Sequence, residues 1–290
     1  MRGVIIINQD NSHNLSKIKR LKEEAALLHL DLDVIVNDGT IAYIDKNGKV
    51  ITSLKCDFII YLDKDYYLAK MLEQAGYTLF NDPKFLKLCD DKMLTYITLS
   101  NHGIRMPLTM SAPLIYRDYI NEENYLFLDK VIKTIGLPLV VKKVYGSLGE
   151  GVYLANNKEE LKEIYCKNFM YPLLFQSYVE NSKGRSARVI VIDEKIVGAF
   201  ERYNSKDFRS NYGGSASSRP LTLNKKQEEF VKRIASLLHI KYAGIDLLFD
   251  NDEPILCEIN SNAFFEEFEK VTGINVAKQY LEMIVNTLKK

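Results

Sequence analysis

Residues 243–260 read AGIDLLFDNDEPILCEIN, two apolar segments on either side of a polar turn. If these segments form a hairpin centred on residue 252, the numbers of two paired residues add up to about 504. Asp246 then lies opposite Glu258. Alternation along the strand puts Asn260 on the same face as Glu258. Opposed carboxylates repel each other unless a cation lies between them, and three hard oxygen groups suit Mg²⁺. The alternative is an acidic pair that shares a proton or faces solvent.

A second stretch, residues 138–151, reads PLVVKKVYGSLGEG and joins an apolar strand to a glycine-rich loop. The strand carries Lys142, and the loop has glycines at positions 146, 149 and 151. Such a loop brings backbone N–H groups close to an anion, and a lysine adds a point charge for phosphate. It is not a Walker A motif, because no helix begins at the last glycine. The alternative is a plain hairpin with a solvent-facing lysine.

A third stretch, residues 202–215, reads RYNSKDFRSNYGGS and concentrates cations and small polar residues. The pattern predicts a loop, and Arg188 lies on a predicted strand just before it. Guanidinium groups in this region suit a transferring phosphoryl group or a substrate carboxylate. The alternative is a flexible loop whose polar side chains only keep it solvated.

The first eighty residues alternate the patterns of strands and helices. Strands are expected at residues 3–8, 32–36, 58–62 and 77–80, helices at 15–30 and 66–75, and a hairpin at 41–51. This alternation predicts a parallel sheet with covered faces, and one helix is expected next, at residues 85–101. Further strands are expected at 139–143, 151–154, 173–179, 187–192 and 196–201, and helices at 157–165, 224–239 and 275–288. The predicted class is therefore α/β in the first part and α+β in the second.

The composition excludes several classes of function. The chain has 290 residues, of which 47% are hydrophobic and 27% charged, and its net charge is +1. The balanced charge argues against a chain-wide nucleic-acid surface, and no apolar run approaches the ~18 residues of a membrane span. No secretory signal is visible, so the expected location is cytoplasmic. Scattered cysteines and histidines predict reduced thiols and leave oxygen ligands for any metal.

The order of these motifs along the chain resembles that of the ATP-grasp superfamily, most closely the RimK-like α-L-glutamate ligases. The similarity covers residues 91–277, and the stretches that carry it are 91–93, 138–142, 175–179, 207–211, Asp246, Glu258-x-Asn260 and 269–273. The resemblance implies a pre-ATP-grasp α/β domain at residues 1–84 and a two-subdomain ATP-grasp fold after it. The N-terminal (lid) subdomain is expected at 85–175 and the C-terminal subdomain, with the metal site, at 176–290.

The resemblance also implies ATP and two Mg²⁺ ions as ligands, with Mn²⁺ as an alternative ion. Phosphate contacts are expected from two lysines and a glycine lid, namely Lys92, Lys142, Gly146, Ser147, Gly149 and Gly151. The metal ligands would be Asp246, Glu258 and Asn260. The arginines that neutralise the transferring phosphoryl group would be Arg188, Arg202 and Arg209. Other nucleotide contacts, including hinge and ribose, would come from Gln176, Ser177, Tyr178, Val179, Glu180, Ser186, Ser210 and Asn211.

The implied reaction transfers the γ-phosphoryl group of ATP onto a carboxylate, and an amine then attacks the acyl phosphate to give an amide, ADP and phosphate. The expected substrates are a small-molecule or peptide carboxylate and amine, such as an amino acid, a peptide or a protein terminus. No nucleic-acid or membrane partner is expected, and a closed homo-oligomer is expected by family similarity only. The alternatives are an ATP-grasp kinase and a nucleotide-binding regulator that has lost turnover.

The chain departs from the family pattern at two places. The family usually has an acidic residue where Ser186 stands, which affects the expected ribose contact. It usually follows the metal-binding asparagine with a small residue, Pro and Gly, whereas residues 261–265 read SNAFF. Glu266, Glu267 and Glu269 follow, and we hypothesise that they attract an amine substrate. The alternative is that these acids are favoured at a helix N-terminus.

Overall fold

The computed structural model describes residues 1–8, 12–147, 149–211 and 216–289. Leu148 of the predicted glycine lid and residues 212–215 of the predicted arginine-rich loop lie outside these ranges. The strands of the described part form three larger sheets and one small hairpin. One of the larger sheets is parallel and two are antiparallel, which confirms the predicted combination of α/β and α+β.

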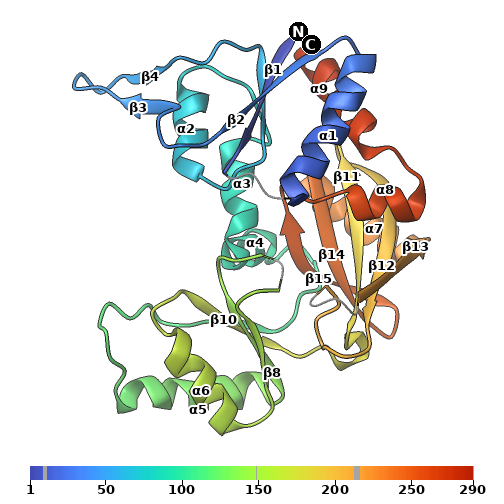
Figure 1. Cartoon of the computed structure of the whole chain (residues 1–290). Coiled ribbons are helices and arrows are strands. Elements are labelled where there is room, and N and C mark those ends of the chain that lie inside the picture. Colours follow the sequence, from blue (N-terminus) through green and yellow to red (C-terminus); the bar gives the residue numbers. More distant parts are fainter. Residues whose placement is uncertain (9–11, 148, 212–215, 290) are drawn as a thin grey trace.

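The first sheet is parallel and has the strand order β2-β1-β5-β6. Its neighbouring strands β1 and β2 are labelled in Figure 1. Its strands are β1 (Arg2–Ile7), β2 (Asp31–Val36), β5 (Phe58–Tyr61) and β6 (Leu79–Phe80). The helices of this region are α1 (Ser12–Leu27) and α2 (Tyr66–Gln74), and its hairpin is β3 (Ala42–Ile44) with β4 (Val50–Thr52). The central strand β1 is buried from its second residue onward, as a continuous apolar run predicts for a covered parallel strand.

Two helices, α3 (Pro83–Asp90) and α4 (Lys92–Leu99), occupy the place of the single helix predicted at residues 85–101. That prediction was wrong because Asp91 has an extended backbone, and its side chain accepts a hydrogen bond from the N–H of Leu94. A carboxylate in this position caps a new helix by satisfying an otherwise free N–H group. The break puts Lys92 at the first position of α4.

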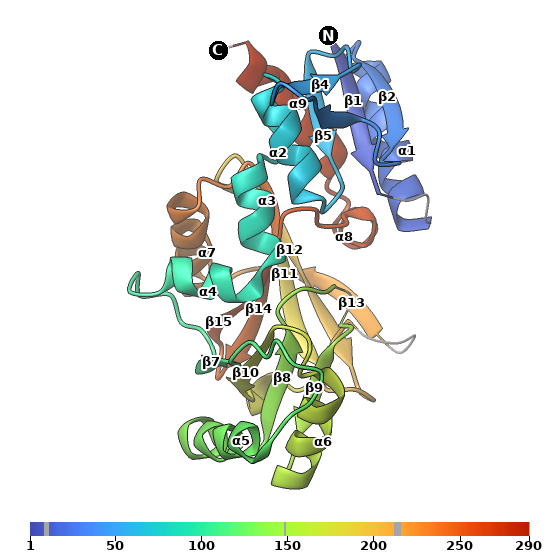
Figure 2. The ribbon, with the colours of Figure 1, turned by 90° about the vertical axis from the view of Figure 1, so that its left-hand side faces the viewer.

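The second sheet is antiparallel, in the order β7-β10-β8-β9. Its strands are β7 (Thr109–Ser111), β8 (Leu139–Lys143), β9 (Val152–Ala155) and β10 (Leu173–Ser177). The helices α5 (Glu122–Ile135) and α6 (Lys158–Asn168) share a hydrophobic core with it (Figure 2). Helix α5 was not predicted, although a capping box at Asn121 begins it and Gly136 follows its last residue.

The third sheet is antiparallel, in the order β13-β12-β11-β14-β15. Its strands are β11 (Arg185–Ile192), β12 (Lys195–Asn204), β13 (Ala216–Leu221), β14 (Tyr242–Asp250) and β15 (Glu253–Asn260). The helices of this part are η1 (Glu180–Ser182), α7 (Lys225–Leu237), α8 (Glu266–Thr272) and α9 (Val276–Leu288). Arg202 was predicted to lie in a loop, which was wrong, because β12 extends to Asn204 and pairs at Arg202 with both β11 and β13.

One hydrophobic core joins the beginning and the end of the chain. Ile5 and Phe58 of the first sheet belong to the same buried cluster as Tyr242 and Tyr280, and α1 packs against α9. Figure 1 shows both termini at the same end of the molecule. The predicted domain limits at 84/85 and 175/176 fall inside α3 and β10, and the division into three domains stays a prediction. Within the described ranges, no helix combines the length and apolarity needed to cross a membrane.

Candidate active site

The two predicted phosphate-binding lysines reach from the second sheet and α4 toward the third sheet. Lys142 is buried on β8, and its Nζ lies 3.9 Å from Sγ of Cys257 on β15. Lys92 is buried at the start of α4, and its Nζ donates a hydrogen bond of 2.8 Å to the carbonyl oxygen of Gly146. The same Nζ lies 3.6 Å from Oε1 of Glu258. Both cations therefore lie beside the strand that carries the predicted metal ligand.

The glycine loop is held by its backbone conformation and by Arg209. Gly151 has a φ of +69°, and a Cβ atom there would lie 2.9 Å from the Lys143 side chain, so this position favours glycine. Arg209 donates from Nη1 to the carbonyl oxygen of Gly149 at 3.0 Å. Its Nε and Nη2 bind the carboxylate of Asp207 at 3.0 and 2.8 Å. Arg209 thus connects the loop after β8 to the loop after β12.

Asp246 pairs with Glu258 in the β14–β15 hairpin, as predicted, but a β-bulge is required for it. Near the turn, the register is shifted by one residue from the prediction, because Leu247 pairs with Leu256. Cys257 is the extra residue in β15 that brings Glu258 opposite Asp246. In a regular hairpin Asp246 would face Cys257, and Glu258 would point to the opposite face of the sheet.

The three predicted metal ligands supply two carboxylates and one amide. Arg188 of β11 binds both oxygens of Asp246, at 2.7 and 2.6 Å, and the Asn260 amide donates to Asp246 at 3.3 Å. Among the described residues, no group of three or more His, Cys, Asp or Glu side chains could hold a metal. A set of two carboxylates and an amide oxygen suits Mg²⁺ that takes its remaining ligands from substrate phosphates and water. The donor chemistry of Asp246, Glu258 and Asn260 therefore fits the expected ion.

A pocket between the second and third sheets collects most of the predicted nucleotide contacts. The predicted residues that line it are Lys92, Lys142, Gly146, Ser147, Gly149, Gln176, Ser177, Tyr178, Val179, Ser186, Arg209, Ser210, Asn211, Asp246 and Glu258. Glu180 and Gly151 are not among the described residues of this lining. Gln176 donates to Thr109 at 2.9 Å, while its buried Oε1 has no partner in the described part of the chain. This oxygen can accept a hydrogen bond from a ligand.

A second and wider cavity, of about 990 Å³, adjoins the pocket at Asp246 and Glu258. Arg188, Arg202 and Asn260 line this cavity and are not among the described residues that line the pocket. Arg202 binds a single oxygen of Glu267 through Nε and Nη2, at 3.2 and 3.1 Å. Burial, together with the neighbouring Arg188, lowers the pKa of Arg202. Two of the three predicted arginines thus share the wide cavity.

Comparison with known proteins agrees with this geometry, since residues 89–284 match the model of the RimK-like ATP-grasp domain. The chain belongs to the RimK-like ATP-grasp family. A human relative, beta-citrylglutamate synthase B, is 28% identical over 90% of this chain and 70% of its own length. A relative from Vibrio atlanticus, a probable alpha-L-glutamate ligase, is 26% identical over 100% of this chain and 97% of its own. The predicted family is confirmed.

A solved structure extends the likeness of this RimK-like chain to its full length. D-alanine–D-alanine ligase from Bacillus anthracis, complexed with ATP, has a TM-score of 0.73. The match covers 100% of this chain and 97% of that one, at 21% sequence identity. At this level of identity the comparison shows a common fold.

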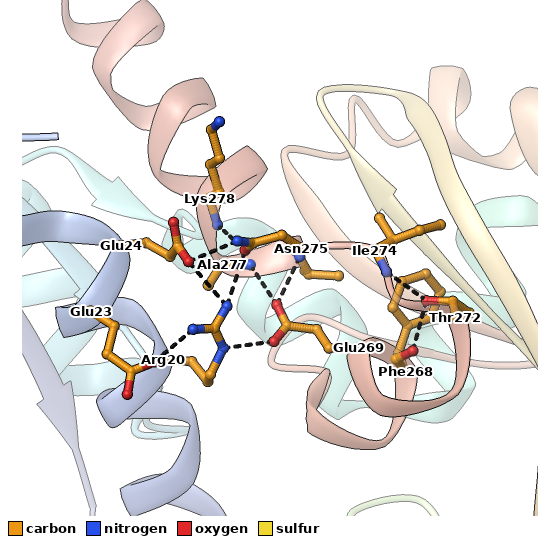
Figure 3. Close-up of polar contacts among 11 residues, drawn as sticks. Arg20, Glu23, Glu24, Phe268, Glu269, Thr272, Ile274, Asn275, Ala277 and Lys278 are labelled. Atoms are coloured by element: carbon orange, nitrogen blue, oxygen red, sulfur yellow. Dashed lines mark hydrogen bonds and ion pairs between the residues drawn. The ribbon is translucent and has the colours of Figure 1, made fainter. Parts of the chain in front are cut away.

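The three glutamates after β15 of this RimK-like chain have different surroundings. Glu269 accepts a hydrogen bond of 2.8 Å from Arg20 and two more from backbone N–H groups at the start of α9 (Figure 3). It is not among the described residues that line the wide cavity, and Arg20 balances its charge, so its part in the hypothesised amine site stays a prediction. Glu267 is paired with Arg202, whereas Glu266 is exposed and lines the cavity.

Lys17 of α1 also lines the wide cavity and was not predicted. It lies on the buried side of the helix, where Asn14, Leu21 and Glu24 are buried as well. A lysine at a helical period within a buried stripe is unusual, because charged side chains are seldom fully buried. Two of these three buried residues, Asn14 and Glu24, are polar, so no local hydrophobic pattern marks Lys17 in the sequence.

Proposed function

We propose that this protein joins a carboxylate to an amine at the expense of ATP, through an acyl phosphate, and releases ADP and phosphate. It is an enzyme of a family of ATP-grasp carboxylate–amine ligases, whose members use ATP and a divalent metal. One observation carries the finer proposal. Lys92 lies 3.6 Å from Glu258, and Lys142 lies beside the same strand, so the lysines predicted to bind phosphate share one pocket with the carboxylates predicted to bind metal.

The metal site of this proposal consists of Asp246, Glu258 and Asn260, which would hold two Mg²⁺ ions or, alternatively, Mn²⁺. Such ions, when bound, neutralise phosphate charge and orient the phosphoryl group. Arg188 binds both oxygens of Asp246 and therefore fixes the orientation of this carboxylate. The two strands β14 and β15 supply all three ligands from one hairpin.

The reaction needs charge neutralisation more than a nucleophilic side chain. Transfer of the γ-phosphoryl group makes the carboxylate an electrophile, and attack of the amine then forms the C–N bond and breaks the bond to phosphate. Lys92 and Lys142 would hold the phosphates of ATP, while Arg188 and Arg202 would balance the charge of the acyl phosphate. Arg209, which binds the carbonyl of Gly149, would hold the glycine loop over the nucleotide.

The wide cavity is the place where the carboxylate and the amine would meet. Two relatives have glutamate in their names, as a beta-citrylglutamate synthase and a probable alpha-L-glutamate ligase. We therefore propose glutamate as one of the two substrates, joined to an amino acid, a peptide or another small acid. Glu266, which is exposed at the cavity, would face the incoming amine.

The test is turnover of Mg²⁺-ATP with a panel of carboxylic acids, with hydroxylamine in place of the amine. Hydroxamate that forms together with ADP supports the ligase. ADP without hydroxamate would instead indicate a kinase, and tight ATP binding without ADP would indicate a regulator. Glu258→Gln should abolish hydroxamate formation. Glu253→Gln is the matched control, because Glu253 lies on the same strand and pairs with Lys226 at the surface.

A further inference from the structure

Ser186 and Ser210 form a hydrogen-bonded pair in the wall of the pocket between the second and third sheets. Their hydroxyl oxygens lie 2.5 Å apart, and the two residues are 8% and 7% exposed. Both residues line the pocket. The bond connects β11 to the loop after β12, so two segments of the chain hold this uncharged part of the wall in place.

The register of the third sheet shows which part of the pocket this pair faces. Arg188 of β11 pairs with Asp246 of β14, and Ser186 precedes Arg188 by two residues on the same strand. Side chains two residues apart on a strand lie on one face, about 7 Å from each other. Ser186 therefore lies one step away from the predicted metal ligands, toward the start of β11 and the predicted hinge contacts that precede it.

The second sheet shows a similar spacing between its two polar positions. Lys142 of β8 pairs with Leu174, which precedes Gln176 by two residues on β10. Gln176 carries the buried Oε1 that has no partner in the described part of the chain and can accept a hydrogen bond from a base. A nucleotide with its phosphates at Lys142 and its base at Gln176 places its ribose between these two positions, beside Ser186.

The carboxylates of the pocket lie elsewhere. Among the described residues that line it, the acidic ones are Glu150, Asp246 and Glu258. Asp246 is bound by Arg188, and Glu258 lies 3.6 Å from Lys92, where the phosphates are expected. Glu150 is exposed and belongs to the glycine loop. The described wall beside the ribose is therefore formed by hydroxyl groups and not by a carboxylate.

A hydroxyl pair discriminates weakly between ribose and deoxyribose. A site that dedicates a buried polar group to a substrate hydroxyl rejects the analogue without it, because that group is left unpaired. Ser186 and Ser210 keep each other as partners when the ligand lacks a hydroxyl. A carboxylate would also accept a charge-assisted hydrogen bond, which is stronger than a bond to a neutral serine.

We propose that this pocket does not select for the 2′-hydroxyl of the nucleotide, so that 2′-deoxy-ATP serves the enzyme as phosphoryl donor about as well as ATP. This inference rests on the ligase function proposed above. Ser186 determines this specificity, because a carboxylate at its position would supply the acceptor that the wall lacks. Such a carboxylate would have Ser210 as a donor and Arg202, the cross-strand neighbour of Ser186, as a counter-charge.

The test is isothermal titration calorimetry with ADP and with 2′-deoxy-ADP, in the presence of Mg²⁺. The dissociation constants of the wild type for the two nucleotides should differ by less than about fivefold. Ser186→Asp should bind ADP at least about tenfold more tightly than 2′-deoxy-ADP. Ser217→Asp is the matched control and should keep the wild-type ratio, because Ser217 is exposed on β13 and is not among the described residues that line the pocket.

Two results would overturn the assignment of Ser186. One is a wild type whose ratio exceeds the stated limit, which would show that another group, such as Glu180, reaches the 2′-hydroxyl. The other is a Ser186→Asp protein that keeps the wild-type ratio while its melting temperature shows that it is folded. The first comparison needs no variant, so it does not depend on how Ser186→Asp folds.

Failure of the ligase function is seen separately. It would appear as the absence of hydroxamate with both ATP and 2′-deoxy-ATP, while the two diphosphates still bind. A protein that binds neither diphosphate would refute the nucleotide pocket and this inference together.

Discussion

Replacing Lys17 by methionine should change how the stability of the protein depends on pH. Burial, together with the charge of Arg188, lowers the pKa of Lys17 from its ordinary value of 10.5 to about 7. Between these two values the folded protein has released the proton and the unfolded chain still holds it, so stability rises with pH. The two pKa values differ by about 3.5, which corresponds to a free energy of about 5 kcal/mol. Below pH 7 the buried charge of Lys17 destabilises the folded wild type by this full amount.

The assay is urea unfolding of the wild type, Lys17→Met and Lys19→Met at about pH 7, 8 and 9. Relative to Lys17→Met, the wild type should gain about 1.4 kcal/mol in free energy of unfolding for each pH unit. Loss of the hydrogen bonds to Asn262 and Ala263 shifts Lys17→Met by a constant amount and leaves this slope unchanged. Exposed Lys19 should give a profile parallel to the wild type. Parallel profiles for the wild type and Lys17→Met would refute the reasoning.

Three further outcomes are expected. In EDTA, Asp246→Asn should lower the free energy of urea unfolding by about 3 kcal/mol, because it removes the carboxylate that pairs with buried Arg188. Glu258→Gln, whose ion pair is longer and more exposed, should cost less than about 1 kcal/mol, and equal losses would contradict this account. Gly151→Ala should lower stability by about 1 kcal/mol or more and raise KM for ATP in steady-state assays, and an unchanged KM would argue against the loop's role. EDTA should abolish ADP production and added Mg²⁺ should restore it, whereas turnover that persists in EDTA would exclude the metal.

The local pattern predicted the first sheet well, because covered parallel strands are continuous apolar runs such as residues 4–7. It missed the break at Asp91, because buried positions continue at a helical period on both sides, from Phe85 to Leu99. It also missed the extension of β12 through Arg202, because that part of the strand is held by pairing with β11 on one side and β13 on the other. These two failures share a cause. The helix break depends on a capping side chain and the end of the strand depends on neighbouring strands, and neither changes the spacing of hydrophobic residues.

The sequence by itself determined which chemical groups are available. A lysine before a glycine-rich turn, and two carboxylates with an amide on neighbouring strands, can be identified because alternation and turn residues are local properties. Only the tertiary structure decided which of these groups meet. The bulge at Cys257, whose carbonyl accepts a hydrogen bond from Tyr96 of α4, sets Glu258 opposite Asp246. Lys17 is buried because α1 packs against the loop after β15, about 245 residues away along the chain. Register and burial of this kind depend on packing between distant segments, which no local pattern encodes.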